Sequence, residues 1–198
     1  MKARPTMEIR EGSPPDWLAQ FENEPSIIFV LDSTFHLRYC NASWDRFALE
    51  NGGSNLLRKT QIGVDVMEIT PEPLRAFYSA LYSRVLKSGE ETDHVYECSS
   101  GEKLRLFRMR VRRADTHLVV INSLALEQEY EDYGFPGDLQ ALQDDNGIVT
   151  MCCHCRKTRL PNAVNLWVRI PGFVNKMPPL VSHGICSDCF STYYPDFD

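Results

Sequence analysis

The chain has 198 residues, of which 43% are hydrophobic and 24% are charged, and its formal net charge is −6 at pH 7. This apolar fraction supports a packed core and excludes disorder for most of the chain, and the length fits one domain with a small second unit. The longest apolar run, Ile27–Leu31, is far shorter than the ~18 residues of a membrane span, and the N-terminus lacks an apolar signal core. We therefore expect a cytoplasmic protein without membrane contact, in a compartment where structural disulfides are rare.

Cysteine and charge are distributed unevenly along the chain. Five of the seven cysteines lie in the last 47 residues. Residues 150–198 carry a net charge of +2, which leaves −8 for residues 1–149. This asymmetry indicates two modules of different chemistry.

A short amphipathic helix is predicted near the N-terminus. Ser13 and the two prolines that follow it suit the first turn of a helix. Trp17, Leu18 and Phe21 would share one face, which must dock on another part of the protein because its exposure to water is unfavourable. We assign residues 1–24 to this N-terminal segment.

A β-hairpin and a helix come next. The β-branched run 27–31 and the run 36–40 flank turn residues that begin at Asp32, which predicts two antiparallel strands. Asn41 is a good N-cap for a helix over residues 42–50, where apolar side chains recur at helical spacing.

The strongest helix signal lies over residues 71–88, where seven apolar side chains recur with a helical period and Gly89 suits the end. Three strands are predicted after it, over residues 92–99, 103–113 and 116–126. Strands that flank helices without regular β-α-β alternation favour an α+β domain, in which an antiparallel sheet carries helices on one side.

Residues 25–126 resemble a PAS domain in the order of these elements. The matching features are the opening hairpin with Asp32 at its turn, the exit through Asn41 into the first helix, the long helix before Gly89 and the closing three-strand meander. The resemblance implies a five-stranded antiparallel sheet with helices over one face. It also implies a domain that senses, dimerises or docks partners, sometimes around a small ligand. We therefore expect a homodimer, formed through this domain or the N-terminal helix, and an unknown signalling protein as partner.

Residues 127–150 carry seven acidic residues and no basic one, together with Pro136 and three glycines. This composition is typical of a solvated linker with at most one helical stretch. We predict that this acidic linker separates the PAS-like domain from a second module over residues 151–198.

Two C-x2-C pairs are the strongest chemical signal in the second module. Cys152 and Cys155 form the first pair, and Cys186 and Cys189 form the second, thirty residues later. Zn²⁺ prefers four thiolates in a tetrahedron, and a full protein shell leaves no open position for catalysis. Because residues 152–198 hold too few apolar side chains for an independent core, we predict that a structural zinc ion stabilises this module.

Two questions about this site stay open from spacing alone. Four thiolates suit an iron–sulfur cluster as well as they suit zinc. Cys153, His154 or His183 could replace a ligand, although we expect Cys153 to be spare and both histidines to lie beside the site or on the surface.

The end of the chain resembles a small tail that follows PAS and related modules in bacterial signalling proteins. The matching segments are Cys152-x-x-Cys155 with the basic residues after it, and Ser182-His183-Gly184-Ile185 before Cys186-x-x-Cys189. The resemblance implies a bacterial signalling setting and a metal-binding knuckle of the zinc-finger type.

Large apolar side chains are expected between the helices and the sheet, either around a cavity for an unidentified small ligand or, as we favour, in a filled core. Haem-binding PAS domains use a histidine on the long helix, and flavin-binding light sensors use a Gly-x-Asn-Cys-Arg segment. Helix 71–88 contains no histidine and no such segment is present, so the resemblance leads us to expect neither haem nor flavin. We read His36, His94 and His117 as solvated or hydrogen-bonded. The core set is Phe29, Trp44, Phe47, Phe77, Tyr78, Leu81, Tyr96, Phe107 and Met109.

The strand 103–113 is strongly basic. From Phe107 on, Phe107, Met109 and Val111 alternate with Arg108, Arg110 and Arg112, so these three arginines share one face. Leu104 and Leu106 fall on the arginine side, which predicts a bulge or a partly covered sheet face. A nucleic-acid surface is one interpretation. We favour pairing with Asp93, Glu97 and Glu102 on the neighbouring strand and turn, so nucleic acid is not expected as a partner.

No catalytic residues are found: the chain lacks a nucleophile-elbow sequence and a phosphate-binding glycine loop. We therefore expect a non-enzymatic bacterial signalling protein, in which a PAS sensor or interaction domain is coupled to a structural zinc module that mediates partner contact or dimerisation. The alternatives are a thiol and zinc redox switch and a transcription-linked nucleic-acid binder.

Overall fold

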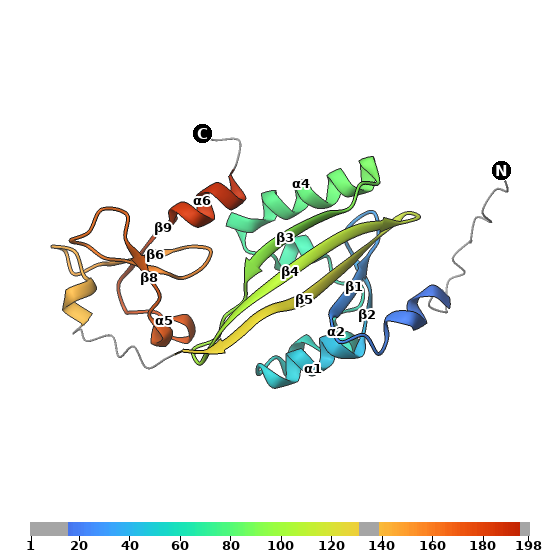
Figure 1. Cartoon of the computed structure of the whole chain (residues 1–198), viewed down its shortest axis with the longest axis horizontal. Helices are drawn as coiled ribbons and strands as arrows, with labels where there is room; N and C mark the ends of the chain where they lie inside the picture. Colours follow the sequence, from blue (N-terminus) through green and yellow to red (C-terminus); the bar gives the residue numbers. More distant parts are fainter. Residues whose placement is uncertain (1–15, 131–138, 195–198) are drawn as a thin grey trace.

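The computed structural model describes residues 16–130 and 139–194. Its larger part is a five-stranded sheet of order β2-β1-β5-β4-β3 in which all neighbours are antiparallel (Figure 1). Helices lie over one face, which confirms the predicted α+β class. The strands are β1 (Ile27–Leu31), β2 (Leu37–Cys40), β3 (Thr92–Glu97), β4 (Lys103–Ala114) and β5 (His117–Glu129).

The helical layer is dominated by α4, whose 17 residues make it the longest described helix. It ends at Gly89, which has a left-handed φ of 75° and donates its N–H to Val85, as predicted for a glycine stop. None of the described helices is both long and apolar enough to cross a membrane. The helices are η1 (Asp16–Phe21), α1 (Ala42–Glu50), η2 (Ser54–Leu56), α2 (Arg58–Gln61), α3 (Val66–Ile69) and α4 (Glu72–Ser88).

The main core lies between α4 and the helix-facing side of the sheet. Alternate residues of each strand point into it, since side chains of a strand alternate between its two faces. Burial of these side chains supplies most of the driving force that holds α4 on the sheet. The fully buried members include Leu31, Leu37, Val85, Val111, Leu118 and Val120.

The opposite face of the sheet is covered in part by η1. Leu18 and Phe21 are 4% and 7% exposed, and they pack against Ile28, Val30 and Val119. The apolar face predicted for the N-terminal helix therefore docks within its own chain. Ser13 and the prolines expected at its start lie outside the described residues.

Leu104 and Leu106 lie on a partly covered sheet face, one of the two explanations that the sequence offers for them, because both line a pocket together with Arg169 and Pro171. The pairing of β4 with β5 shifts between Leu106 and Phe107, whose partners are Leu126 and Leu124, so the extra residue lies in β5 and the side chains of β4 keep their alternation. β5 continues to Glu129, beyond the predicted end at residue 126, because Glu127 pairs with Lys103 across the strands.

The turn between β1 and β2 is organised by Asp32. Its Oδ1 atom accepts hydrogen bonds from the N–H groups of Thr34 and His36 at 2.9 and 3.0 Å, and its Oδ2 atom lies 2.6 Å from Arg38. Burial by itself raises the pKa of this carboxyl, but the hydrogen bonds from Thr34, Arg38 and His36 outweigh it and lower the pKa to about 2.

Asp32→Asn is expected to lower the free energy of unfolding at pH 7 by about 1 kcal/mol, a value reduced for the solvent exposure of Arg38. A carboxyl whose pKa is lower in the folded state stabilises the fold above its unfolded pKa. The difference between the two proteins should therefore vanish as the pH falls from 3.8 toward 2. Urea unfolding at a series of pH values measures this, and a difference independent of pH would contradict it.

The C-terminal unit contains a four-stranded sheet of order β8-β7-β6-β9, in which only β6 and β9 are parallel. Its small core includes Leu142 and Val149 from the acidic stretch, with Met151 and Ile170. None of the four strands of this sheet is predicted from the sequence. The elements are η3 (Leu139–Leu142), β6 (Val149–Cys152), β7 (Thr158–Arg159), β8 (Trp167–Val168), α5 (Pro171–Asn175), β9 (Val181–Gly184) and α6 (Ser187–Tyr193).

Candidate functional site

Four cysteines from two loops meet at one end of the C-terminal sheet. Cys152 ends β6, Cys155 lies in the turn after it, and Cys186 and Cys189 stand at the N-cap and in the first turn of α6. The parallel pairing of β6 with β9 places Cys152 level with Gly184, two residues before the second pair. All four sulfur atoms lie within 4.8 Å of one another. The structure thus brings together the four residues proposed as metal ligands.

The backbone of both cysteine loops directs N–H groups at the sulfur atoms. The N–H of Cys186 donates to Sγ of Cys152 at 3.4 Å, and the N–H of Lys157 bonds to Cys155. Arg156 has a left-handed φ of 60°, which turns the chain sharply after the second cysteine of the pair. Such N–H groups stabilise thiolates, which are the form of cysteine that binds a metal.

The thiols of this cluster lie close enough to form hydrogen bonds with one another, which shifts their pKa values. Hydrogen bonds from Cys155 and Cys189 lower the pKa of Cys152, although burial opposes this. Hydrogen bonds to Cys152 and Cys155, with burial, raise the pKa of Cys189. One thiolate is therefore stabilised by the protons of its neighbours, and a cation at the centre would displace those protons, so metal affinity should fall as the pH falls.

The three alternative ligands lie outside the cluster. Cys153 is half-buried and its sulfur is not part of the group of four, and His183 is exposed on β9. The ring of His154 stacks on the ring of Tyr193 at 4.6 Å between centroids, and its Nε2 atom lies 3.3 Å from the hydroxyl of Tyr194. Among the described residues, the group with metal-binding geometry contains none of the three.

An apolar cavity of about 440 Å³ lies between the helices and the five-stranded sheet. Most of the aromatic residues that the sequence places in this layer line it, although we favoured a filled core. Phe77 packs instead against Tyr193, and Phe107 packs against Phe47. The lining includes Phe29, Trp44, Phe47, Tyr78, Tyr96 and Met109, with Leu74 of α4.

A pair of polar groups marks one wall of this cavity. The hydroxyl of Tyr96 donates to Oδ1 of Asn122 at 3.0 Å, and both residues line the cavity. Asn122 is only 4% exposed. Apolar walls with a few fixed polar groups are the usual features of a small-molecule site.

Two of the three histidines of the sheet domain are hydrogen-bonded as expected, whereas His94 is not. His36 contacts Thr34, and His117 contacts Thr116. The Nε2 atom of His94 is buried without a hydrogen-bond partner among the described residues. Burial lowers the pKa of His94, so the ring is held in its neutral form.

The basic strand is neutralised largely by neighbouring acids. Arg108 forms an ion pair with Asp93 at 3.2 Å, as expected, and Arg105 pairs with Glu127 at 2.6 Å. Glu97, in contrast, pairs with Arg169 of the C-terminal unit instead of a strand arginine. This pairing does not favour a nucleic-acid surface, which needs unpaired basic groups.

Comparison with known proteins gives matches of fold alone. No family model matches the chain, and no curated protein matches it. The PAS domain of the Cronobacter turicensis RpfR quorum-sensing receptor, solved in complex with BDSF, is 15% identical with a TM-score of 0.42 and covers 52% of this chain and 97% of its own.

Two further solved structures illustrate the range of similar chains. The photoactive yellow protein domain from the sensor histidine kinase Ppr of Rhodospirillum centenum is 15% identical, with a TM-score of 0.38, over 53% of this chain and 90% of its own. The phage VqmA–DPO complex is 14% identical, with a TM-score of 0.42, over 55% of this chain and 50% of its own. All three alignments cover about half of this protein.

Proposed function

We propose that the chain is a non-enzymatic bacterial signalling protein, in which a PAS-like sensor body acts together with a structural zinc module that mediates contact with a partner or a second copy. The observation that carries this proposal is the convergence of four cysteine sulfurs from two C-x2-C loops within 4.8 Å. Four protein ligands fill the shell of a tetrahedral ion, so the metal has no open position and holds the two loops together.

The spacing of the sulfur atoms favours a single ion over a cluster. Zn–S bonds of about 2.3 Å in a tetrahedron place the sulfurs about 3.8 Å apart. Sγ of Cys155 and Sγ of Cys186 lie 3.6 Å apart. The cysteine sulfurs around a four-iron cluster stand much farther apart, because the iron and sulfide ions lie between them.

The sensor half of the proposal is supported by the cavity in the sheet domain. Its volume of about 440 Å³ suits a small molecule, and its Tyr96–Asn122 pair offers an orienting polar contact. A ligand that fills it would bear on α4 and on β3, which supply Tyr78 and Tyr96 to its walls.

Native mass spectrometry of protein purified without added metal tests both halves. We expect one zinc ion per chain, a homodimer, and in part of the sample an extra mass from a retained small molecule. Elemental analysis of the same sample distinguishes zinc from iron. A chain that carries no metal, or equal amounts of iron and sulfide, would refute the zinc module.

A further inference from the structure

The C-terminal unit contacts both faces of the edge strand β3. On the helix side, the ring centroid of Tyr193 in α6 lies 5.0 Å from that of Phe77 in α4 and 5.6 Å from that of His94 in β3. Glu97 points to the opposite face, where it forms an ion pair with Arg169, and their side chains are only 16% and 12% exposed. Figure 1 shows α6 beside the first turns of α4, and α5 near the start of β4 and the end of β5.

Both contacts are positioned by the cysteine loops. Tyr193 lies one helical turn after Cys189, and His154 of the first loop stacks on the Tyr193 ring. Arg169 also donates to the backbone carbonyl of Cys155 at 2.9 Å. The four sulfurs come from the first loop and from the start of α6. An ion bound to all four would therefore hold Tyr193 and Arg169, the two residues that contact β3, in fixed positions.

The ring contacts continue from Tyr193 to the cavity. His94 stacks on Tyr96 with 6.0 Å between ring centroids, and Phe77 contacts Tyr78 at 5.2 Å. Tyr78 and Tyr96 both line the cavity. Packed aromatic rings therefore extend without interruption from the cavity wall to the loop that carries the cysteines, and each such contact favours one relative placement of its partners.

We propose that metal binding at the four cysteines is energetically coupled to the packing of the cavity wall through the contact of Tyr193 with Phe77 and His94. The inference rests on the proposed function. It specifies that the PAS-like body and the zinc module communicate through this direct contact and not through the acidic stretch 127–150. Coupling between two sites is reciprocal, so a ligand that orders the wall raises metal affinity by the same factor as the metal raises ligand affinity.

Hydrogen–deuterium exchange of the full chain, loaded with Zn²⁺ or treated with a chelator, tests this coupling. Removal of the metal is expected to speed exchange about 5- to 20-fold in β3 and in the first half of α4. The strand β2 serves as an internal reference and should not respond, because it supplies no residue to the cavity wall and forms the opposite edge of the sheet from β3. Unchanged exchange in β3 and α4 of a zinc-bearing chain would overturn the coupling but leave the zinc module intact. A chain without metal overturns both.

Three variants locate the coupling at the aromatic ring. Tyr193→Leu should exchange rapidly in β3 even when loaded with Zn²⁺, and it should lose most of its response to the chelator. Tyr193→Phe keeps the ring and should respond like the parent. Phe190→Leu removes a ring of the same helix that stacks on Tyr194, and it should also respond like the parent. A Tyr193→Leu protein that responds as strongly as the parent would overturn the proposal.

Discussion

Cys186→Ser is expected to abolish metal binding and to unfold the C-terminal sheet, at a cost of at least about 3 kcal/mol to the stability of that unit. Cys186 is 1% exposed and its sulfur is one of the four in the cluster, where a serine hydroxyl would bind zinc poorly. The apolar core of the unit is small, so the metal supplies much of the energy that keeps the two loops together.

Cys153→Ser is the matched control for this experiment. It removes a thiol from the same loop, one residue from Cys152, but from outside the sulfur cluster. We expect it to retain one metal ion and near-parental stability. Metal content by elemental analysis and limited proteolysis of the C-terminal unit measure both effects. Equal metal loss in the two variants, or full metal content in Cys186→Ser, would contradict the assignment of ligands.

The elements with strong local signals were predicted well. Asn41 caps α1 and Gly89 ends α4, as the sequence indicates, because caps and turns depend on a few adjacent residues. The partly covered sheet face at Leu104 and Leu106 was visible in the sequence, since apolar side chains stand there on the arginine side of the strand. The pairing of the two C-x2-C motifs followed from ligand chemistry alone.

Features that depend on distant contacts were not predicted. The strands of the C-terminal sheet have two to four residues each and no alternating pattern, and β6 pairs in parallel with β9 some thirty residues away. Leu142 lies in a stretch whose acidic composition suggests solvent exposure, yet it is 1% exposed in the core of that unit. His94 is enclosed by rings from α4, from α6 and from its own strand, and no local pattern specifies the contacts with the two helices.

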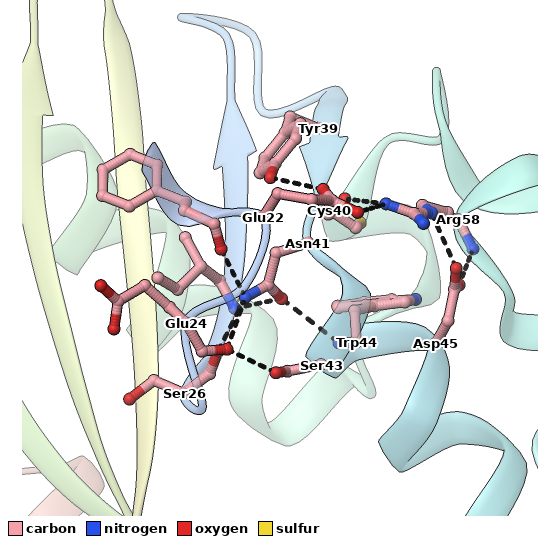
Figure 2. A network of polar contacts seen from close by, with 12 residues as sticks. Glu22, Glu24, Ser26, Tyr39, Cys40, Asn41, Ser43, Trp44, Asp45 and Arg58 are labelled. Carbon is pink, nitrogen blue, oxygen red and sulfur yellow. Dashed lines mark hydrogen bonds and ion pairs between the residues drawn. The ribbon is translucent and has the colours of Figure 1, made fainter. Parts of the chain in front are cut away.

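Asn41→Ala is expected to lower the free energy of unfolding of the sheet domain by about 3–4 kcal/mol. The side chain is 0% exposed and makes five hydrogen bonds at the junction of η1, β1 and α1 (Figure 2). Its Oδ1 atom accepts from the N–H groups of Ile28 and Trp44, and its Nδ2 atom donates to three backbone carbonyls, including that of Ser26 at 2.9 Å. Alanine leaves these buried groups without partners, which costs far more than the loss of a helix cap.

Asp65→Ala provides the comparison for an ordinary helix cap. Asp65 caps α3 by accepting from the N–H of Met67 at 2.8 Å at a partly exposed position, so its loss should cost only about 1 kcal/mol. Urea unfolding of both variants, followed by the signal of the sheet domain, measures the difference. Equal losses would show that Asn41 acts as a cap alone and would contradict the wider role.

Asn41→Asp separates the donor and acceptor roles of this side chain. A carboxylate keeps the bonds from Ile28 and Trp44 but faces the three carbonyl oxygens that the amide now satisfies. Burial beside those oxygens raises the pKa of the new carboxyl above its unfolded value, so the folded state binds the proton more tightly. The variant should therefore be least stable near neutral pH and should approach the parent as the pH falls through that raised pKa. The opposite trend, with stability lost on acidification relative to the parent, would mean that the donated hydrogen bonds contribute little.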